Sequence, residues 1–153
     1  MLISNPIREF LPPSWWNRAH DYFEYSVDYN TLAASAVAAP RNINIDADSD
    51  FLVLSVSRVI TTDASGATEQ PFAEQLIRVM DSASGANWMN EFTHLDNFAG
   101  RMAVDGFGPK WLEVPRLVIR SAAITIELTN LEAAARRIWI TFHGCKIFNR
   151  IRE

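Results

Sequence analysis

The C-terminal third of the chain, residues 111–148, alternates apolar and polar side chains with the two-residue period of a β-strand. In residues 124–129 isoleucine and leucine alternate with threonine and glutamate, and residues 138–143 repeat the pattern. A third apolar run at 117–119 follows Pro115, and proline is tolerated in a sheet mainly at a strand start or an edge. Three strands in succession predict a sheet with one buried face, so the earlier residues must supply an opposing layer.

Several upstream segments also have strand character. Residues 22–29 are rich in aromatic and β-branched side chains, and residues 42–47 alternate isoleucine with polar residues. Residues 51–61 give the longest strand pattern, and apolar residues on both faces at its start are typical of a central strand. Residues 75–81 predict a further strand, with Leu76 and Met80 directed inward.

Two shorter elements are expected between the fourth long strand and the C-terminal third. Residues 87–91 indicate a short strand or a bulged edge. Residues 92–100 predict one short helix, because Phe92, Leu95 and Phe98 have helical spacing and Gly100 is a typical stop. The alanine-rich residues 30–40 are compatible with a helix or equally with a loosely packed connection or edge segment.

About eight short strands with polar turns, one short helix and no alternation of strands with helices predict an all-β fold. We expect a two-sheet β-sandwich of the jelly-roll type, with residues 1–21 as an extended N-terminal arm and residues 22–153 as a single domain. With 153 residues, 48% of them hydrophobic, the chain is long enough to bury a sizeable core. An immunoglobulin-like sandwich is the alternative, but the cysteine pair typical of that fold is absent.

The arm combines three prolines, which disfavour helix interiors and sheet ladders, with large apolar side chains. Such a segment either folds back over an open end of its own sandwich or lies on a neighbouring subunit or another protein. The second alternative makes the arm, together with two glycine-containing loops, the predicted partner-binding surface. Its predicted residues are Ile7, Phe10, Leu11, Trp15 and Trp16 in the arm and Gly66 and Phe107 in the loops.

Charge and hydropathy exclude several classes of partner. A net charge of −4 argues against nucleic-acid binding, and the basic cluster of Lys146, Arg150 and Arg152 is interpreted as a solvated terminus. No apolar run approaches the roughly 20 residues of a membrane helix, so no membrane partner is expected. Residues 1–11 lack the apolar core of a secretion signal, so we expect synthesis and action from a cytoplasm. Cys145 is the one cysteine, which rules out an intramolecular disulfide and suggests a small buried side chain.

The residues that could carry chemistry give no pattern for catalysis. His20, His94 and His143 have no metal-ligand spacing, and neither a nucleophile elbow nor a glycine-rich phosphate loop occurs. We therefore predict neither an enzyme nor a cofactor. The three aspartates at 46, 48 and 50 resemble the start of a calcium loop. A glycine at the sixth position and a glutamate at the twelfth are missing, which favours an ordinary turn.

Several of these segments together resemble the small jelly-roll virion proteins of tailed bacteriophages. The resemblance covers residues 22–148, and its motifs are Leu-Ala-Ala at 32–34, Asp-Ser-Asp-Phe at 48–51, Pro-Phe at 71–72, PRLVIRSAAITIELTN at 115–130 and RIWITFHGCKIF at 137–148. It implies a non-enzymatic virion subunit made in the host cytoplasm, either a decoration or cement subunit on the capsid surface or a minor structural part near the tail. Such a subunit would form a homo-oligomer and bind the major capsid protein or other virion proteins.

Two other classes of function remain open at this stage. A tail-associated, receptor-binding or carbohydrate-binding jelly roll would use exposed aromatic side chains as platforms, for which Trp88, Trp111 and Trp139 are candidates. A cupin-like enzyme would need a cluster of histidines lining one sheet, which the three dispersed histidines do not provide.

Overall fold

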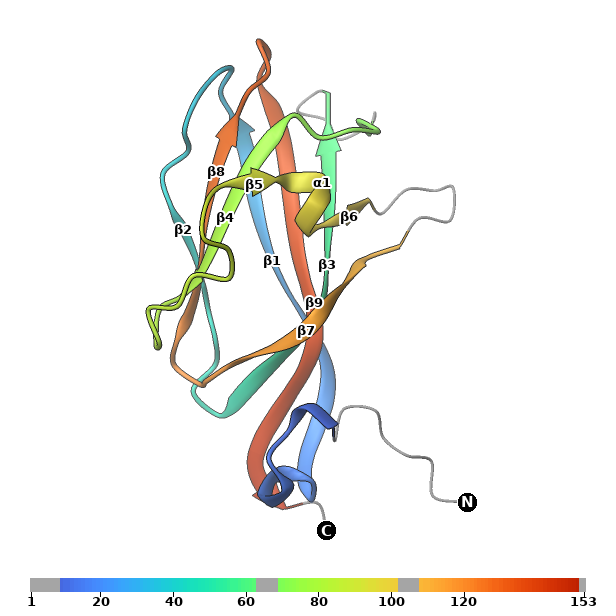
Figure 1. Ribbon diagram of the computed structural model, residues 1–153, viewed down its shortest axis with the longest axis vertical. Helices are drawn as coiled ribbons and strands as arrows, with labels where there is room; N and C mark the ends of the chain where they lie inside the picture. The colour runs from blue at the N-terminus through green and yellow to red at the C-terminus, as the bar shows by residue number, and fades with distance from the viewer. Residues whose placement is uncertain (1–8, 63–68, 102–107, 152–153) are drawn as a thin grey trace.

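The computed structural model describes residues 9–62, 69–101 and 108–151, which fold into two β-sheets packed face to face (Figure 1). The first sheet holds β1 (Arg18–Leu32), β9 (Arg136–Ile151), β3 (Ser49–Thr61), β6 (Gly100–Arg101) and β7 (Lys110–Val118). The second sheet holds β2 (Arg41–Asn44), β8 (Ala123–Asn130), β4 (Gln75–Asp81) and β5 (Thr93–His94). Two helical elements matter for the arrangement below, the 3-10 turn η2 (Pro13–Trp15) and the single-turn helix α1 (Leu95–Phe98).

The strand order confirms the predicted jelly roll. The first sheet runs β1-β9-β3, after which both β7 and the two-residue β6 pair with β3, and the second sheet runs β2-β8-β4-β5. With β6 set aside, successive strands alternate between the sheets, except that β4 and β5 both belong to the second sheet. The first and last strands are neighbours, and the middle strands lie at the other edge. This is the double Greek key of a jelly roll. All pairings are antiparallel except that of β3 with β6.

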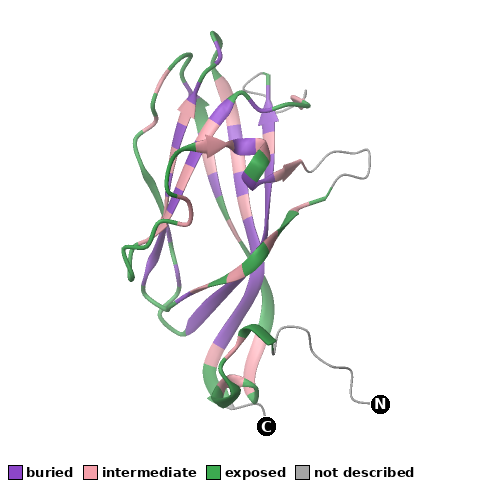
Figure 2. Ribbon diagram, viewed as in Figure 1, coloured by how far each residue is buried: buried purple, intermediate pink, exposed green. Residues whose placement is uncertain are grey.

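The core lies between the facing sides of the two sheets, and the predicted periodicity holds there. On β8 the side chains of Ile124, Ile126 and Leu128 are fully buried, whereas the intervening residues are partly exposed. Ile138, Ile140 and Phe142 of β9 are fully buried in the same core. The central strand β3 is buried along almost its whole length on both faces, as its sequence predicts (Figure 2).

Gly144 lies on β9, between β1 and β3, at a position where only glycine fits. A Cβ atom at this position would lie 2.0 Å from the backbone oxygen of Leu52. The close approach coincides with a register shift between Val53 and Ser55, where β3 bulges against β9. A side chain at Gly144 would therefore force the two strands apart at the centre of the sheet.

Strand β7 contains a pronounced bulge that includes Pro115. Arg116 lies opposite Val53 of β3 and Trp111 lies opposite Ser55, so four residues of β7 face one residue of β3. Proline cannot donate a ladder hydrogen bond, which is why it is accommodated at a bulge on a strand that the described structure pairs with β3 alone. The bulge directs Leu112 toward the core, while Val114 remains 64% exposed.

A buried ion pair fixes helix α1 to β3. The Arg58 side chain is 1% exposed, and its Nε and Nη2 atoms donate to Oδ1 of Asp96 at 2.9 and 2.6 Å. The guanidinium also donates to the backbone oxygens of Gln70 and Pro71, and Oδ2 of Asp96 accepts the backbone N–H of Ala73. A buried charge is tolerated only when it is paired and hydrogen-bonded, and this one joins α1, β3 and the residues that lead into β4.

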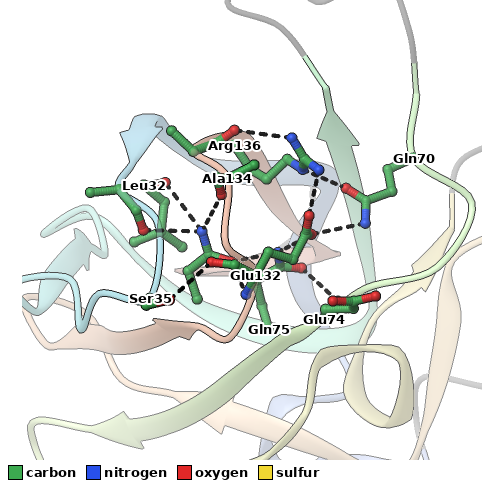
Figure 3. A network of polar contacts seen from close by, with 11 residues as sticks. Leu32, Ser35, Gln70, Glu74, Gln75, Glu132, Ala134 and Arg136 are labelled. Atoms are coloured by element: carbon green, nitrogen blue, oxygen red, sulfur yellow. Dashed lines mark hydrogen bonds and ion pairs between the residues drawn. The ribbon is translucent and has the colours of Figure 1, made fainter.

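A polar network closes the end of the sandwich where β1 ends and β9 begins (Figure 3). The Glu132 carboxylate is 7% exposed and accepts hydrogen bonds from Gln70 and Gln75 at 2.8 Å, and it pairs with Arg136 at 2.5 Å. Asn130 donates to the backbone oxygens of Leu32, Ala33 and Ala134, which holds the loop after β8 against the end of β1. These contacts satisfy backbone groups that would otherwise be orphaned at the strand ends.

Two expectations about individual elements are corrected. Leu76 and Met80 do not point inward, because Ile77 and Val79 are the fully buried residues of β4. Residues 87–91 form a turn region with a single bridge from Asn87 to Met80 and no strand. The short helix predicted within 92–100 is confirmed as one turn between β5 and β6. Of the alternatives for residues 30–40, the structure has the end of β1 and a connection, not a helix.

Candidate functional site

The described part of the N-terminal arm, residues 9–17, lies at the end of the molecule where β1 begins and β9 ends (Figure 1). Strand β1 already begins at Arg18, so the last four residues of the predicted arm belong to the sheet. None of residues 9–17 is buried. Figure 2 shows mainly exposed and intermediate residues at this end of the molecule, whereas buried residues are frequent in the sheets above it.

Four predicted binding residues are brought together in this segment. Phe10 and Trp16 are 46% and 43% exposed, and Leu11 and Trp15 are half-buried. The segment has internal order, because the indole N–H of Trp16 donates to the backbone oxygen of Leu11 at 3.2 Å and the Arg18 guanidinium stacks 4.0 Å from the Trp15 ring. The other predicted residues, Ile7, Gly66 and Phe107, lie outside the described residues.

A pocket adjoins this segment. Its volume is about 340 Å³, and it is lined by Ser14, Asn17, Arg18, Asn149 and Arg150. Arg18 lies 3.7 Å from the carboxylate of Asp50, and Arg150 stacks 5.1 Å from the Phe148 ring. The end of the molecule thus presents exposed aromatic side chains beside two arginines, which is the composition enriched at protein interfaces.

A row of polar side chains crosses the outer face of the first sheet, on β3, β9 and β1. Ser57 Oγ lies 2.7 Å from Nε2 of His143, and Nδ1 of His143 lies 2.8 Å from Oε1 of Glu24. The Tyr22 hydroxyl donates to the same Glu24 oxygen at 2.5 Å. The hydrogen bond from Tyr22, helped by that from His143, lowers the pKa of Glu24 despite an opposing effect of burial.

This row has the atom order of a serine–histidine–acid relay, and sequence analysis did not anticipate it. Ser57 is 3% exposed, which leaves its hydroxyl without the open face that an acyl substrate needs. Tyr22 also competes with His143 for the carboxylate, because both bond to one oxygen of Glu24. The row is therefore best described as a hydrogen-bonded ladder that joins three neighbouring strands.

The aspartates at 46, 48 and 50 each have a separate protein partner. Asp46 pairs with Lys146, whose hydrogen bond lowers the Asp46 pKa, and Ser49 donates to Asp48 at 3.0 Å. Asp50 accepts the backbone N–H of Arg120 at 2.9 Å. Across the described ranges, no group of three or more histidine, cysteine, aspartate or glutamate residues is placed to hold a metal ion. Cys145 is buried, and burial raises the pKa of its thiol.

A second surface feature is a groove between β7 and α1, with a volume of about 290 Å³. Its lining includes Trp88, Asn97, Phe98, Trp111, Glu113 and Arg116. Trp111 is 68% exposed at the rim, whereas Trp88 is partly buried. The third candidate platform, Trp139, is on the outer face of the first sheet, where Arg137 stacks 4.3 Å from its ring, so it does not contribute to the groove.

Comparison of the chain with family models, with curated proteins and with solved structures finds no match. Within the described residues no helix is both long enough and apolar enough to span a membrane. The features that bear on function are therefore the jelly-roll topology, the aromatic segment at residues 9–17 and the groove between β7 and α1.

Proposed function

We propose that this protein is a structural subunit of a bacteriophage virion, a capsid decoration protein that binds the coat-protein lattice through its N-terminal arm. The observation that carries the proposal is the exposed aromatic pair Phe10 and Trp16 on an ordered segment without buried residues. The jelly-roll fold and the resemblance of residues 22–148 to small virion proteins support the same role. Partners in this role are the major capsid protein and further copies of the chain.

The position of the arm suits attachment without disturbing the core. The opposite end of the sandwich is closed by the Glu132 network, while residues 9–17 of the arm occupy the end where β1 begins (Figure 1). Pro12 and Pro13 restrict the backbone before binding, so ordering the segment on a partner costs less entropy than ordering a flexible tail. Trp16 and Phe10 then supply the large aromatic contacts that dominate many interfaces.

The test compares particles assembled with the intact chain and with a chain that lacks residues 1–16. We expect the truncated protein to fold with a nearly unchanged melting temperature, because its described residues in this range are not buried. Its occupancy on purified virions should be strongly reduced. The double substitution Phe10→Ala/Trp16→Ala should have the same effect, whereas Phe72→Ala, at a 75% exposed aromatic outside the arm, should not.

Each part of the proposal has its own contrary result. If the intact chain is not found in purified virions, the decoration role is wrong. If the truncated chain fails to fold, the arm is an internal lid of the sandwich. Full occupancy of the truncated chain would show that the arm is not the anchor and would direct attention to the loops that contain Gly66 and Phe107.

A further inference from the structure

We propose that the groove between β7 and α1 is a saccharide-binding site, with Trp111 as the platform for the sugar ring. The inference goes beyond the virion role and does not depend on it, because β7 and α1, which line the groove, lie away from the end of the molecule that holds residues 9–17 (Figure 1). Its volume of about 290 Å³ is near the lower limit for small-molecule sites and suits one or two sugar rings.

The aromatic part of the groove has a fixed floor and an open rim. Trp88 packs against Phe98 and Phe142 with ring centroids 6.4 and 5.9 Å apart, which ties the floor to the core. Trp111 is 68% exposed on the rim and lines the same groove. Covering a large, water-exposed aromatic surface with an apolar face is favourable. The C–H face of a pyranose ring is an apolar face of this kind.

The polar part of the groove offers both kinds of hydrogen-bonding group. The Glu113 carboxylate accepts, the Arg116 guanidinium donates and the Asn97 side chain can do both. Within the described ranges, the side chains of Glu113 and Arg116 make no hydrogen bond or ion pair, so they are available to a ligand. Sugar hydroxyls donate and accept at once, and this mixed set around a tryptophan matches them better than it matches an apolar protein surface.

The walls of the groove are held in place before any ligand binds. The Lys110 ammonium donates to the backbone oxygen of Asn97, which joins β7 to α1 across one end. At the same end Gly100 approaches the strand so closely that a Cβ atom there would lie 2.3 Å from the backbone oxygen of Gly108. Glu113 and Val114, which belong to the bulge of β7, line the same groove. Bulges commonly direct side chains at functional sites, and a rigid site loses less entropy on binding.

The test titrates the intact chain with maltose, lactose, chitobiose and sialyllactose, followed by nuclear magnetic resonance shifts and by calorimetry. We expect at least one of the four to bind with a dissociation constant in the roughly micromolar to millimolar range. Trp111→Ala should weaken that binding at least tenfold, and Glu113→Gln or Arg116→Gln severalfold. Phe72→Ala is the matched control, since it removes an exposed aromatic side chain outside the groove and should leave the affinity unchanged.

Either of two results would overturn the inference: the absence of binding by all four sugars to a folded protein, or binding that Trp111→Ala leaves unchanged. Sedimentation of the same variant then distinguishes one further case, in which no sugar binds and Trp111→Ala dissociates an oligomer. In that case β7 and its exposed tryptophan form a contact between protein chains.

Discussion

Replacing Glu132 by glutamine tests whether the network at the end of the sandwich stabilises the fold through a charged acceptor (Figure 3). In the wild type, Arg136 donates to one carboxylate oxygen of Glu132 at 2.5 Å, and Gln70 and Gln75 donate to the other oxygen. Glutamine at this position keeps an oxygen for Gln70 and Gln75 but presents an amide N–H donor to Arg136. The variant loses this charge-assisted bond and leaves the poorly solvated Arg136 guanidinium without its carboxylate partner. The free energy of unfolding should therefore fall by about 2 to 4 kcal/mol.

The assay is urea unfolding followed by circular dichroism at neutral pH. Glu74→Gln is the matched control, because Glu74 is exposed and the substitution should change the unfolding free energy by less than about 0.5 kcal/mol. An effect of Glu132→Gln as small as that of the control would refute the reasoning, since it would mean that the carboxylate adds nothing that a neutral amide cannot supply.

The stabilisation that Glu132 provides should also depend on pH, in a direction that follows from its pKa. Burial alone would raise the pKa of Glu132, but hydrogen bonds from Gln70, Gln75 and Arg136 outweigh it and lower the pKa below its ordinary value of 4.5. The folded state therefore binds the proton more weakly than the unfolded state, and the stabilisation is present above the unfolded pKa and lost as the pH falls through the folded pKa. The difference between the wild type and Glu132→Gln should shrink toward zero at acidic pH, and a difference independent of pH would contradict the proposed charge.

Two further substitutions test the core and the buried ion pair. Ile126→Ala should cost about 2 to 5 kcal/mol in urea melts, whereas Thr125→Ala, on the exposed face of β8, should cost far less, and equal effects would contradict the assigned faces. Asp96→Asn should cost about 3 to 5 kcal/mol, because Arg58 is 1% exposed and would keep its charge without a carboxylate; a change within the error of the melts would show that water or backbone oxygens suffice.

Periodicity predicts the strands of this fold where only one face is apolar. Ile124, Ile126 and Leu128 alternate with polar residues, so hydrophobic burial alone determines which face of β8 meets the core. Strand β4 carries apolar residues on both faces, and there the prediction failed. Leu76 and Met80 compete with Ile77 and Val79, and the choice depends on the cross-strand neighbours on β8, which local sequence does not reveal.

The candidate sites were less accessible to sequence analysis than the strands. Exposed aromatic residues in the arm could be predicted because prolines keep the segment out of both sheets. The groove could not, since it requires the bulge in β7 and the placement of α1 beside it. The ladder of Ser57, His143 and Glu24 depends on the register of three strands that are far apart in the chain, and no local pattern specifies that register.

The distribution of polar contacts explains how this jelly roll can leave large aromatic side chains exposed on two surfaces. Its buried charges are concentrated where strands and loops need fixing, as in the ion pair of Arg58 with Asp96 and the network around Glu132. The exposed aromatic residues Phe10, Trp16 and Trp111 lie elsewhere, on the arm and on a strand edge. Substitutions at these three positions should therefore alter binding with little effect on stability, whereas substitutions at Arg58 or Glu132 should do the reverse. Measuring both properties for each variant separates a surface that binds from one that merely completes the fold.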